Sequence, residues 1–479
     1  MVRVLHVGLS LLVSSAFAQS TNLTALFRAV LSPGAQIILP GPNGTWSPEV
    51  QTRWSDYRAP QYQAVIKPVT EADVQRIVNV ARTHGVSFLT TGGGHSTADF
   101  SVFAGISIDL GNFKSATLDA SNSLLTVGGA TEFVDIYNLL YDAGKELPVG
   151  SCACPGIVGS SIAAGLSPLM GERGLLTDAL TSVRLVTADG RLVTASRTRN
   201  PDLFWAIRGA GNNFGVITSA TFKVYNATND GQAMTASMVF PAATNGSFWD
   251  ALHALDKNMS SKLSITALGF YFREFSLPVV VLNAIYFGPQ AEGEALLQPF
   301  TDLGPTLVPT TIAMTPQKDL YPPIQGSCDP NQHINLYSLA VTKLDPAALQ
   351  AAYGDMVNMW QSYPGYQGRM LIQRFPNDAV ARVPLYETAY PWRDAIAQIS
   401  IEGFMTDTGI YPVVDSFETS LRARLVKTSG YPRLATYAGY AKGTEDASAW
   451  YGSSLPRLVA VKRQWDPRGF FSNSKPIPT

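Results

Sequence analysis

The feature that most constrains this chain is a run of three glycines followed by a histidine. It reads Thr90-Thr91-Gly92-Gly93-Gly94-His95-Ser96, and a second segment, Gly150-Ser151-Cys152, follows downstream. Glycines let consecutive backbone N–H groups turn toward a pyrophosphate, because no Cβ blocks the approach of the anion. Imidazole and thiolate are both nucleophiles that can attack the methyl group or a ring carbon of an isoalloxazine. The two segments together suggest a covalently held flavin, although a glycine run alone is also typical of a tight turn.

Length and composition limit the kinds of protein that the chain can be. A chain of 479 residues is longer than one that usually forms a single hydrophobic core, so two domains are expected. Hydrophobic residues make up 46% and charged residues 15%, which allows a large interior. The 35 Lys and Arg residues against 36 Asp and Glu leave no excess charge to attract nucleic acid or an anionic membrane. We therefore expect a monomer whose partner is a small, roughly neutral molecule.

The N-terminus predicts passage through a secretory pathway. Arg3 precedes an apolar stretch over residues 4–13, and Ala16-Phe17-Ala18 precedes Gln19, which is typical of a signal peptide over residues 1–18. The most apolar later region, residues 265–287, is interrupted by Arg273-Glu274, so no membrane span is expected. We predict a secreted, soluble glycoprotein. The five glycosylation sequons begin at Asn22, Asn43, Asn226, Asn245 and Asn258.

Three cysteines are too few for a disulfide framework, and their odd number needs an explanation in an oxidising compartment. They are Cys152, Cys154 and Cys328. If Cys152 binds the flavin, the other two remain available to pair. Burial as a small apolar residue is an equal alternative for Cys328.

The pattern around the glycine run predicts a layer of helices and strands. Thr70 caps a helix with an acidic residue three positions later, and Gly85 ends it. Residues 86–90 are then typical of a short buried strand that leads into the glycine loop. Further helices are expected over residues 131–143 and 202–208, and a hairpin over residues 182–193.

A second glycine-rich stretch, Gly209 to Gly215, superficially matches a dinucleotide-binding fingerprint. A Rossmann loop follows a strand and begins a helix, whereas here a helix precedes the glycines and the strand-like residues 216–225 follow them. The pattern therefore excludes a Rossmann fold while leaving a nucleotide-binding role open.

The central region, residues 226–427, has the pattern of a separate α+β unit. Strands are expected over residues 264–272 and 278–287, and helices over residues 291–300 and 347–363. The tail returns to helix before Asp466-Pro467. Nucleophile-elbow, phosphate-loop and zinc-protease motifs are missing from the sequence. His84, His253 and His333 show no metal-ligand spacing.

Taken in order, the motifs resemble the berberine bridge enzyme-like branch of the vanillyl-alcohol oxidase flavoproteins, fungal members especially. The resemblance covers most of the chain, and the ordered set is highly specific. It rests on Gly-Gly-Gly-His95-Ser96, on Gly150-Ser151-Cys152 through Gly165, on Asn200-Pro201 through Gly211 and Gly215, on Trp450-Tyr451-Gly452, on Leu455-Pro456-Arg457-Leu458 and on Asp466-Pro467.

This resemblance implies an α+β fold with a two-part PCMH-type FAD-binding domain and a central substrate domain of antiparallel sheet and helices. The FAD domain would comprise residues 45–225 and 428–479, and the substrate domain residues 226–427. FAD would be attached through His95, and through Cys152 where the flavin is held twice. Ala163-Ala164-Gly165 corresponds to a glycine triplet of the family. Counting back from it without gaps places Cys152, and not Cys154, at the position of the cysteine that binds the flavin in relatives. The other residues implied at the cofactor are Gly92, Gly93, Gly94, Ser96, Gly156, Gly159, Gly165, Gly211, Phe214 and Gly215.

The chain departs from the family pattern at three places. Ala163 and Ala164 replace two glycines of a triplet, Ser160 replaces a histidine, and Gly439 replaces the asparagine that commonly precedes Tyr440. The added methyl groups require slightly more room beside the cofactor.

Two residues are candidates for the catalytic base. Tyr440 matches the tyrosine that serves in related oxidases, and Lys442 is close enough in sequence to be an activating cation. A phenol with a pKa near 10 needs such a cation, or a desolvated hydrogen-bonded setting, to act near neutral pH. Glu387 lies where alkaloid-oxidising relatives have a glutamate-rich segment. The alternatives are an aromatic packing residue for Tyr440 and a solvated surface carboxylate for Glu387.

The resulting expectation is an FAD-linked oxidase that takes two electrons from an alcohol, a sugar hemiacetal or a natural product and passes them to O2. Tailoring of fungal secondary metabolites is favoured, because the central region shows no evident groove pattern of aromatic and polar residues. The alternatives are an oligosaccharide oxidase, an oxidative cyclase, and a secreted flavoprotein without turnover.

Overall fold

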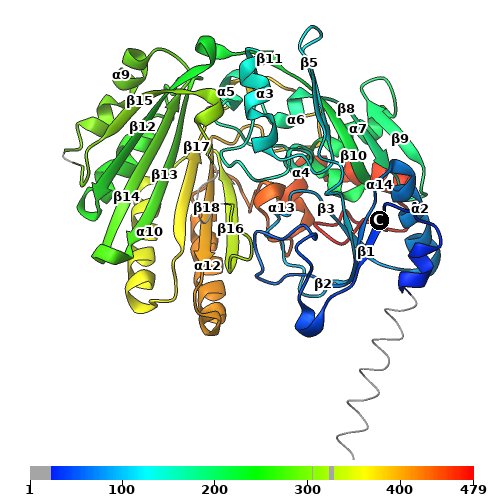
Figure 1. The fold of residues 1–479 in the computed structure, drawn as a ribbon. Coiled ribbons are helices and arrows are strands. Elements are labelled where there is room, and N and C mark those ends of the chain that lie inside the picture. Colours follow the sequence, from blue (N-terminus) through cyan, green and yellow to red (C-terminus); the bar gives the residue numbers. More distant parts are fainter. Residues whose placement is uncertain (1–22, 305, 323–327) are drawn as a thin grey trace, which may run out of the picture.

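Sheets of four, five and seven strands organise the residues described by the computed structural model, 23–304, 306–322 and 328–479. The seven-stranded sheet forms one side of the molecule, and the two smaller sheets form the other together with the C-terminal helices (Figure 1). This arrangement confirms the α+β class. The predicted signal peptide and the sequon at Asn22 lie outside the described residues.

The four-stranded sheet leads the chain into the glycine run. Its order is β1 (Gln36–Ile38), β2 (Gln61–Lys67), β4 (Ala104–Asp109) and β3 (Phe88–Thr91). Helix α2 (Glu71–His84) begins at a capping box in which Thr70 and Asp73 bond to each other's backbone N–H, and it ends at a left-handed Gly85. The predicted helix and strand are therefore confirmed, and β3 ends at the residue before Gly92.

The five-stranded antiparallel sheet follows. Its order is β5 (Ala116–Asp119), β6 (Leu124–Gly128), β10 (Val216–Lys223), β8 (Leu180–Val186) and β9 (Leu192–Ser196), which confirms the predicted hairpin. Helix α7 (Pro201–Ala210) precedes β10, so the second glycine stretch connects a helix to a strand as expected.

The helix predicted over residues 131–143 is wrong in its first half. The chain forms a short 3-10 turn, η2 (Phe133–Ile136), before α3 (Tyr137–Asp142). The N–H groups of Phe133 and Val134 donate to the carbonyls of Pro155 and Ala153, at 3.2 and 2.9 Å. The turn therefore anchors the segment that carries Cys152, a tertiary role that helical periodicity does not reveal.

The C-terminal helices α13 (Ala447–Tyr451) and α14 (Leu455–Trp465) pack beside the smaller sheets (Figure 1). Lys462 is fully buried, and its Nζ donates to Asp466 Oδ2 at 2.7 Å, to the Asn213 carbonyl at 2.8 Å and to the Phe471 carbonyl at 3.1 Å. Three acceptors stabilise a buried ammonium that would otherwise be costly. This contact fixes the end of the chain to the loop between α7 and β10.

The seven-stranded sheet is antiparallel and comes from the central region. Its order is β15 (Thr311–Pro316), β12 (Gln232–Pro241), β14 (Leu277–Tyr286), β13 (Leu263–Phe272), β17 (Arg369–Arg374), β18 (Ala397–Phe404) and β16 (Ile334–Val341). Helices α9 (Gln290–Thr301) and α10 (Pro346–Ser362) confirm the two helices predicted in the central region. Strands β13 and β14 confirm the two predicted strands.

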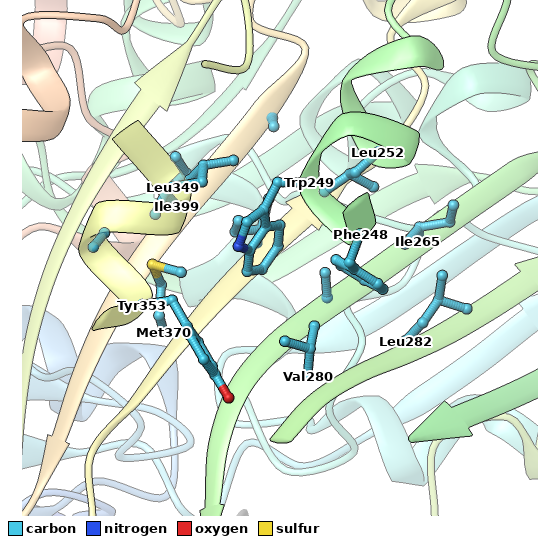
Figure 2. Close-up of a cluster of buried hydrophobic side chains, with 14 of the residues drawn as sticks. Phe248, Trp249, Leu252, Ile265, Val280, Leu282, Leu349, Tyr353, Met370 and Ile399 are labelled. Carbon is cyan, nitrogen blue, oxygen red and sulfur yellow. The ribbon is translucent and has the colours of Figure 1, made fainter. Parts of the chain in front are cut away.

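One face of this sheet holds the largest core. Helices α8 (Asn245–Ala254), α10 and α12 (Tyr411–Val426) pack against it, and Trp249 of α8 lies between the sheet and Leu349 of α10 (Figure 2). Side chains alternate along β13: Ile265 and Ala267 are buried in this core, whereas Thr266 and Leu268 point to the opposite face and are partly exposed. That opposite face carries the polar groups described below.

Cys154 and Cys328 form a disulfide with a Cα–Cα distance of 5.6 Å, and Cys152 keeps its thiol. Of the alternatives for Cys328, pairing is therefore the one observed. The segment after Cys328 runs beside residues 53–54. The backbone N–H groups of Asn331 and Gln332 donate to the carbonyls of Arg53 and Trp54, at 2.9 and 2.7 Å. The disulfide thus joins the segment before Gly156 to the chain that leads into β16.

We expect the Cys154→Ser and Cys328→Ser variants each to lose about 2–4 kcal/mol of unfolding free energy, because the bridge closes a long loop in the unfolded chain. The free energies should be measured by denaturant titration. The double variant should be no less stable than either single variant, since all three lack the same bond. Additive losses would contradict this explanation.

The remaining sequons differ in accessibility. Asn43, Asn226 and Asn258 are exposed, whereas Asn245 is partly buried and accepts a hydrogen bond from Trp249. Glycosylation at these positions stays a prediction. Within the described residues, every helix is too short or too polar to cross a bilayer.

Candidate active site

The glycine run and the segment before Gly156 lie against each other. A Cβ added to Gly93 would approach the nitrogen of Gly156 to 2.6 Å, and one added to Gly92 would approach the carbonyl oxygen of Gly129 to 2.8 Å. Gly94 has φ +67° and faces the carbonyl of Thr52, so a side chain there would be both strained and blocked. The structure therefore brings together the two segments that the sequence paired, in a cradle of bare backbone.

His95 follows this cradle, and its ring stacks on Trp54 with centroids 4.4 Å apart and planes 9° apart. Trp54 also meets Phe404 of β18 edge-on at 6.3 Å. Burial lowers the pKa of His95 to about 4, so the imidazole is neutral at ordinary pH. The neutral ring is the nucleophilic form. Ser96, next to it, is held by a hydrogen bond from Arg53 to its carbonyl at 2.7 Å.

Cys152 lies where its loop meets β17 and β18. Burial raises the pKa of the Cys152 thiol, the charge of Arg369 lowers it and the charge of Glu402 raises it. Arg369 and Glu402 form an ion pair across the two strands, with Nε and Oε2 2.6 Å apart. Gln373 of β17 donates to the hydroxyl of the neighbouring Ser151 at 3.2 Å.

Tyr440 lies in the same cluster. It ends the short turn η9 (Ala438–Tyr440), and its ring packs edge-on against Tyr437 with centroids 5.0 Å apart. Burial raises the pKa of Tyr440 well above its usual value, and a hydrogen bond from the Gln373 side chain opposes that rise. Cys152 is close enough to affect the same pKa. Tyr440, Gln373 and Cys152 therefore form one group.

Lys442 is not the cation beside the Tyr440 hydroxyl that the sequence allowed. Its Nζ donates to the hydroxyl of Tyr337 at 2.7 Å and to Asp415 Oδ1 at 3.0 Å. The ammonium is buried, and the partly exposed Asp415 carboxylate neutralises its charge.

Glu387 lies at the surface, where its carboxylate forms an ion pair with Arg197. The side chain is 29% exposed, and the backbone carbonyl accepts a hydrogen bond from Arg208. The structure does not bring Glu387 into the Cys152–Tyr440 cluster, and this placement favours the alternative of a solvated carboxylate.

The other predicted glycines have mixed positions. The N–H of Gly165 donates to the Tyr437 hydroxyl at 3.2 Å, which links this glycine to the tyrosine pair, while Gly159 is exposed. A Cβ on Gly211 would come within 2.6 Å of Ile162, and one on Gly215 would come within 2.6 Å of the Val186 carbonyl. Phe214 is fully buried. At Gly211, Phe214 and Gly215, contacts within the protein therefore explain the residue type without a cofactor.

Ala164, one of the two departures from the glycine triplet, adopts a backbone conformation that suits glycine. Its φ is +139° and the residue is fully buried. A non-glycine residue in such a region costs on the order of 1–3 kcal/mol.

We therefore expect Ala164→Gly to raise the unfolding free energy by about 1 kcal/mol, after the larger entropy loss of glycine is subtracted. Ala163→Gly is the matched control: Ala163 is the last residue of α4 (Ile157–Ala163), so glycine there should lower stability by about 0.5–1 kcal/mol. Thermal midpoints at one scan rate would compare the two. A lower midpoint for Ala164→Gly would mean that the methyl group stabilises the fold.

Sequence reasoning missed four residues of this cluster: Trp54, Arg369, Gln373 and Glu402. Three of them lie on β17 and β18, and no short motif surrounds them. The available indication was the alternation of polar and apolar residues in β18, which places Ser400 and Glu402 on one face. Three atoms on this face are buried without a hydrogen-bond partner among the described residues: Gln373 Oε1, Gln398 Oε1 and Ser400 Oγ. Such atoms are typical of a site that binds a polar ligand.

The cradle, the neutral imidazole, the thiol and the unpartnered polar atoms fit a flavin dinucleotide: a pyrophosphate needs bare backbone, and an isoalloxazine needs hydrogen-bond partners around its ring. The fold and the cluster therefore define a flavin-dependent oxidoreductase.

Comparisons with known proteins agree with this class. Residues 62–196 match the family model of an FAD binding domain, and residues 436–478 match that of berberine and berberine-like proteins. The FAD-linked oxidoreductase tazG of Aspergillus terreus is 41% identical over 96% of this chain and 95% of its own length. The FAD-linked oxidoreductase azaL of Aspergillus niger is 38% identical over 95% and 98%. The chain belongs to the berberine bridge enzyme-like family of FAD-dependent oxidoreductases.

Solved structures show the same fold. BBE-like 1 of Physcomitrella patens superimposes with a TM-score of 0.83 at 24% identity, over 95% of this chain and 99% of that one. The xylooligosaccharide oxidase of Myceliophthora thermophila C1 gives 0.78 at 26% identity, over 92% and 96%. The glucooligosaccharide oxidase of Acremonium strictum, described as carrying a 6-S-cysteinyl, 8α-N1-histidyl FAD, gives 0.78 at 23% identity, over 89% and 94%.

Proposed function

We propose that this protein is a secreted oxidase that removes a hydride from an alcohol, a hemiacetal or a natural-product C–H bond, with FAD attached through His95 and Cys152 and O2 as the electron acceptor. The observation that carries the proposal is the contact between the glycine cradle and the Cys152 segment, beside Gln373 and Tyr440. We also propose that residues 45–225 and 428–479 hold the cofactor and that residues 226–427 form the substrate domain.

Two features support the double attachment. The His95 imidazole is neutral and held flat against Trp54, which fixes the direction of its nitrogen lone pairs. Cys154 is bonded to Cys328, so Cys152 is the one of these two nearby cysteines that lies outside a disulfide. The histidyl and cysteinyl links of the glucooligosaccharide oxidase provide a precedent in the same fold.

The proposed base is Tyr440, which takes the proton from the substrate oxygen or nitrogen. When bound, FAD supplies the acceptor for the hydride. The N–H of Gln373 donates toward the Tyr440 oxygen and so favours the phenolate, while burial disfavours it. The Arg369–Glu402 pair and the unpartnered Ser400 hydroxyl lie on the same sheet face and are available to orient the substrate.

This assignment predicts a shift in the pH profile of Gln373→Leu. The amide lowers the pKa of Tyr440, so its removal should raise that pKa. A step that requires the phenolate should then need a higher pH, and the rising limb of the rate profile should move upward. Because burial keeps that pKa above 10, steady-state rates between pH 7 and 10 should rise with pH in both proteins, with the profile of Gln373→Leu displaced toward higher pH. Coincident profiles would contradict the role of Gln373.

Tailoring of a fungal secondary metabolite is the substrate class that we favour. The relatives named FAD-linked oxidoreductases come from Aspergillus species and match nearly the whole chain at 38–41% identity. Oligosaccharide oxidation is the second candidate, because the xylooligosaccharide oxidase shares the fold at 26% identity.

A peroxide assay of the flavin-loaded protein with oligosaccharides, aromatic alcohols and phenolic compounds tests the proposal. Release of a carbonyl product with one H2O2 per turnover would support an oxidase, and the active compounds would decide between the two substrate classes. A rearranged ring skeleton would instead identify an oxidative cyclase. A flavin that stays oxidised with every compound under anaerobic mixing would identify a protein without turnover.

A further inference from the structure

A small inner cavity borders the group formed by Gln373 and Tyr440. Its lining includes Gln373 of β17 and Gln398, the residue opposite it on β18. The space open to the centre of a water molecule is about 10 Å³. A cavity of this size holds one water or one diatomic molecule and excludes an organic substrate.

The lining of the inner cavity is mostly apolar. Among the described residues that surround it, none carries a charge. A nonpolar gas such as O2 is more favourably solvated by apolar surroundings than by water. The apolar members of the lining include Leu166, Met170, Leu175, Phe375, Val380 and Ala395.

A larger outer groove at the surface meets the inner cavity at Trp392. Of the described residues, Trp392 is the one that lines both spaces. The outer groove offers about 570 Å³ to the centre of a water molecule, and the exposed Leu385 lies on its lining. Trp392 and Tyr440 both pack against the cluster that contains Phe375. The indole of Trp392 therefore stands between solvent and the proposed reaction site.

Contacts rather than hydrogen bonds hold Trp392 in place. Its indole N–H is buried without a partner in the described part of the chain. Its ring meets Tyr431 edge-on with centroids 5.2 Å apart. A Cβ on Gly452 would lie 2.9 Å from the Trp392 ring, so the missing side chain makes room for the indole. Such a ring changes rotamer without breaking a hydrogen bond, and that movement would join the two spaces.

We propose that Trp392 is the gate of a side passage for O2, which leads from the outer groove through the inner cavity to Gln373 and Tyr440. The inference rests on the proposed function, which supplies the reduced flavin and names O2 as its oxidant. O2 takes up two electrons from that flavin and two protons, and leaves as H2O2. Because the organic substrate is too large for the inner cavity, Trp392 governs reoxidation of the flavin and not its reduction.

Reoxidation is measured without a substrate. The flavin of the loaded protein is reduced by light in the presence of EDTA and then mixed with O2 in a stopped-flow instrument. Trp392→Ala should raise the second-order rate constant about tenfold, and Trp392→Phe should raise it less. Ala395→Leu should lower it, because the larger side chain fills the inner cavity. The matched control is Leu385→Ala, which widens only the outer groove and should leave the rate constant unchanged.

Crystals of the oxidised protein pressurised with O2 give a second result that requires no reaction. Density for a diatomic molecule should appear in the inner cavity of the wild type and of Trp392→Ala, and it should be absent from Ala395→Leu. Identical density with and without O2 pressure would identify a water bound to the unpartnered oxygens of Gln373 and Gln398, and would overturn the proposal.

The kinetic outcomes separate this proposal from the proposed function. Equal rate constants in the wild type, Trp392→Ala and Ala395→Leu would remove Trp392 as a gate while leaving O2 as the acceptor. A wild-type flavin that O2 does not reoxidise would contradict O2 as the acceptor. In that case a flavin that is reoxidised in Trp392→Ala would still support the gate, and one that stays reduced there would overturn it.

Discussion

Replacing both His95 and Cys152 by alanine is expected to release all of the flavin when the protein is precipitated with acid. The wild-type precipitate should stay yellow, because covalent bonds survive unfolding whereas the backbone cradle does not. His95→Ala should weaken that retention, because only the Cys152 link remains. The colour of the pellet and supernatant, read as flavin absorbance after neutralisation, gives the result directly.

Cys154→Ala is the matched control for the tether, because it changes a cysteine two residues away. This sulfur belongs to the disulfide with Cys328, so its loss should lower stability but leave flavin retention unchanged. Unaltered retention in the double variant would remove both residues from the tether. A peptide map of the yellow wild-type protein would then identify the true attachment point.

Tyr440→Phe is expected to slow flavin reduction by about 10²–10⁴-fold, the usual contribution of a positioned acid–base group. Phenylalanine keeps the edge-on packing against Tyr437, so substrate affinity should change far less. Anaerobic stopped-flow mixing, with a substrate found in the peroxide assay, separates the limiting reduction rate from the apparent dissociation constant. Equal losses in both quantities would indicate a packing residue.

Tyr437→Phe is the appropriate comparison for that variant. It removes the hydroxyl that accepts from the Gly165 N–H and donates to the Ser160 carbonyl, and it leaves Tyr440 intact. We expect a loss of stability with a much smaller effect on the reduction rate. If Tyr437→Phe slowed reduction as much as Tyr440→Phe, the two tyrosines would have to act together.

Local sequence patterns predicted the elements whose formation depends on local chemistry. The cap at Thr70, the stop at Gly85 and the strand-forming apolar residues of β13 and β14 each specify an element without reference to the rest of the chain. The helix predicted from residue 131 was wrong because the first turn is tied to the carbonyls of Ala153 and Pro155. That contact is tertiary, so the hydrophobic periodicity of the sequence does not reveal it.

The same distinction applies to the candidate site. The glycine run before His95 forms a contiguous motif and could be found from the sequence. Gln373 and Glu402 come together only because β17 pairs with β18, which brings residues from two separate segments onto one face. Proximity in sequence misled for Lys442, whose long side chain reaches Asp415 instead of the neighbouring tyrosine.

The buried Lys462 has a consequence for biogenesis. Its ammonium joins the C-terminal helix to the Asn213 carbonyl, and the Asn213 amide oxygen in turn accepts from the N–H of Ile477. A nascent polypeptide that still lacks its last few dozen residues has neither contact, so these bonds to the loop between α7 and β10 form only after the C-terminal segment has been made. We therefore expect truncations at the C-terminus to lower both stability and cofactor loading.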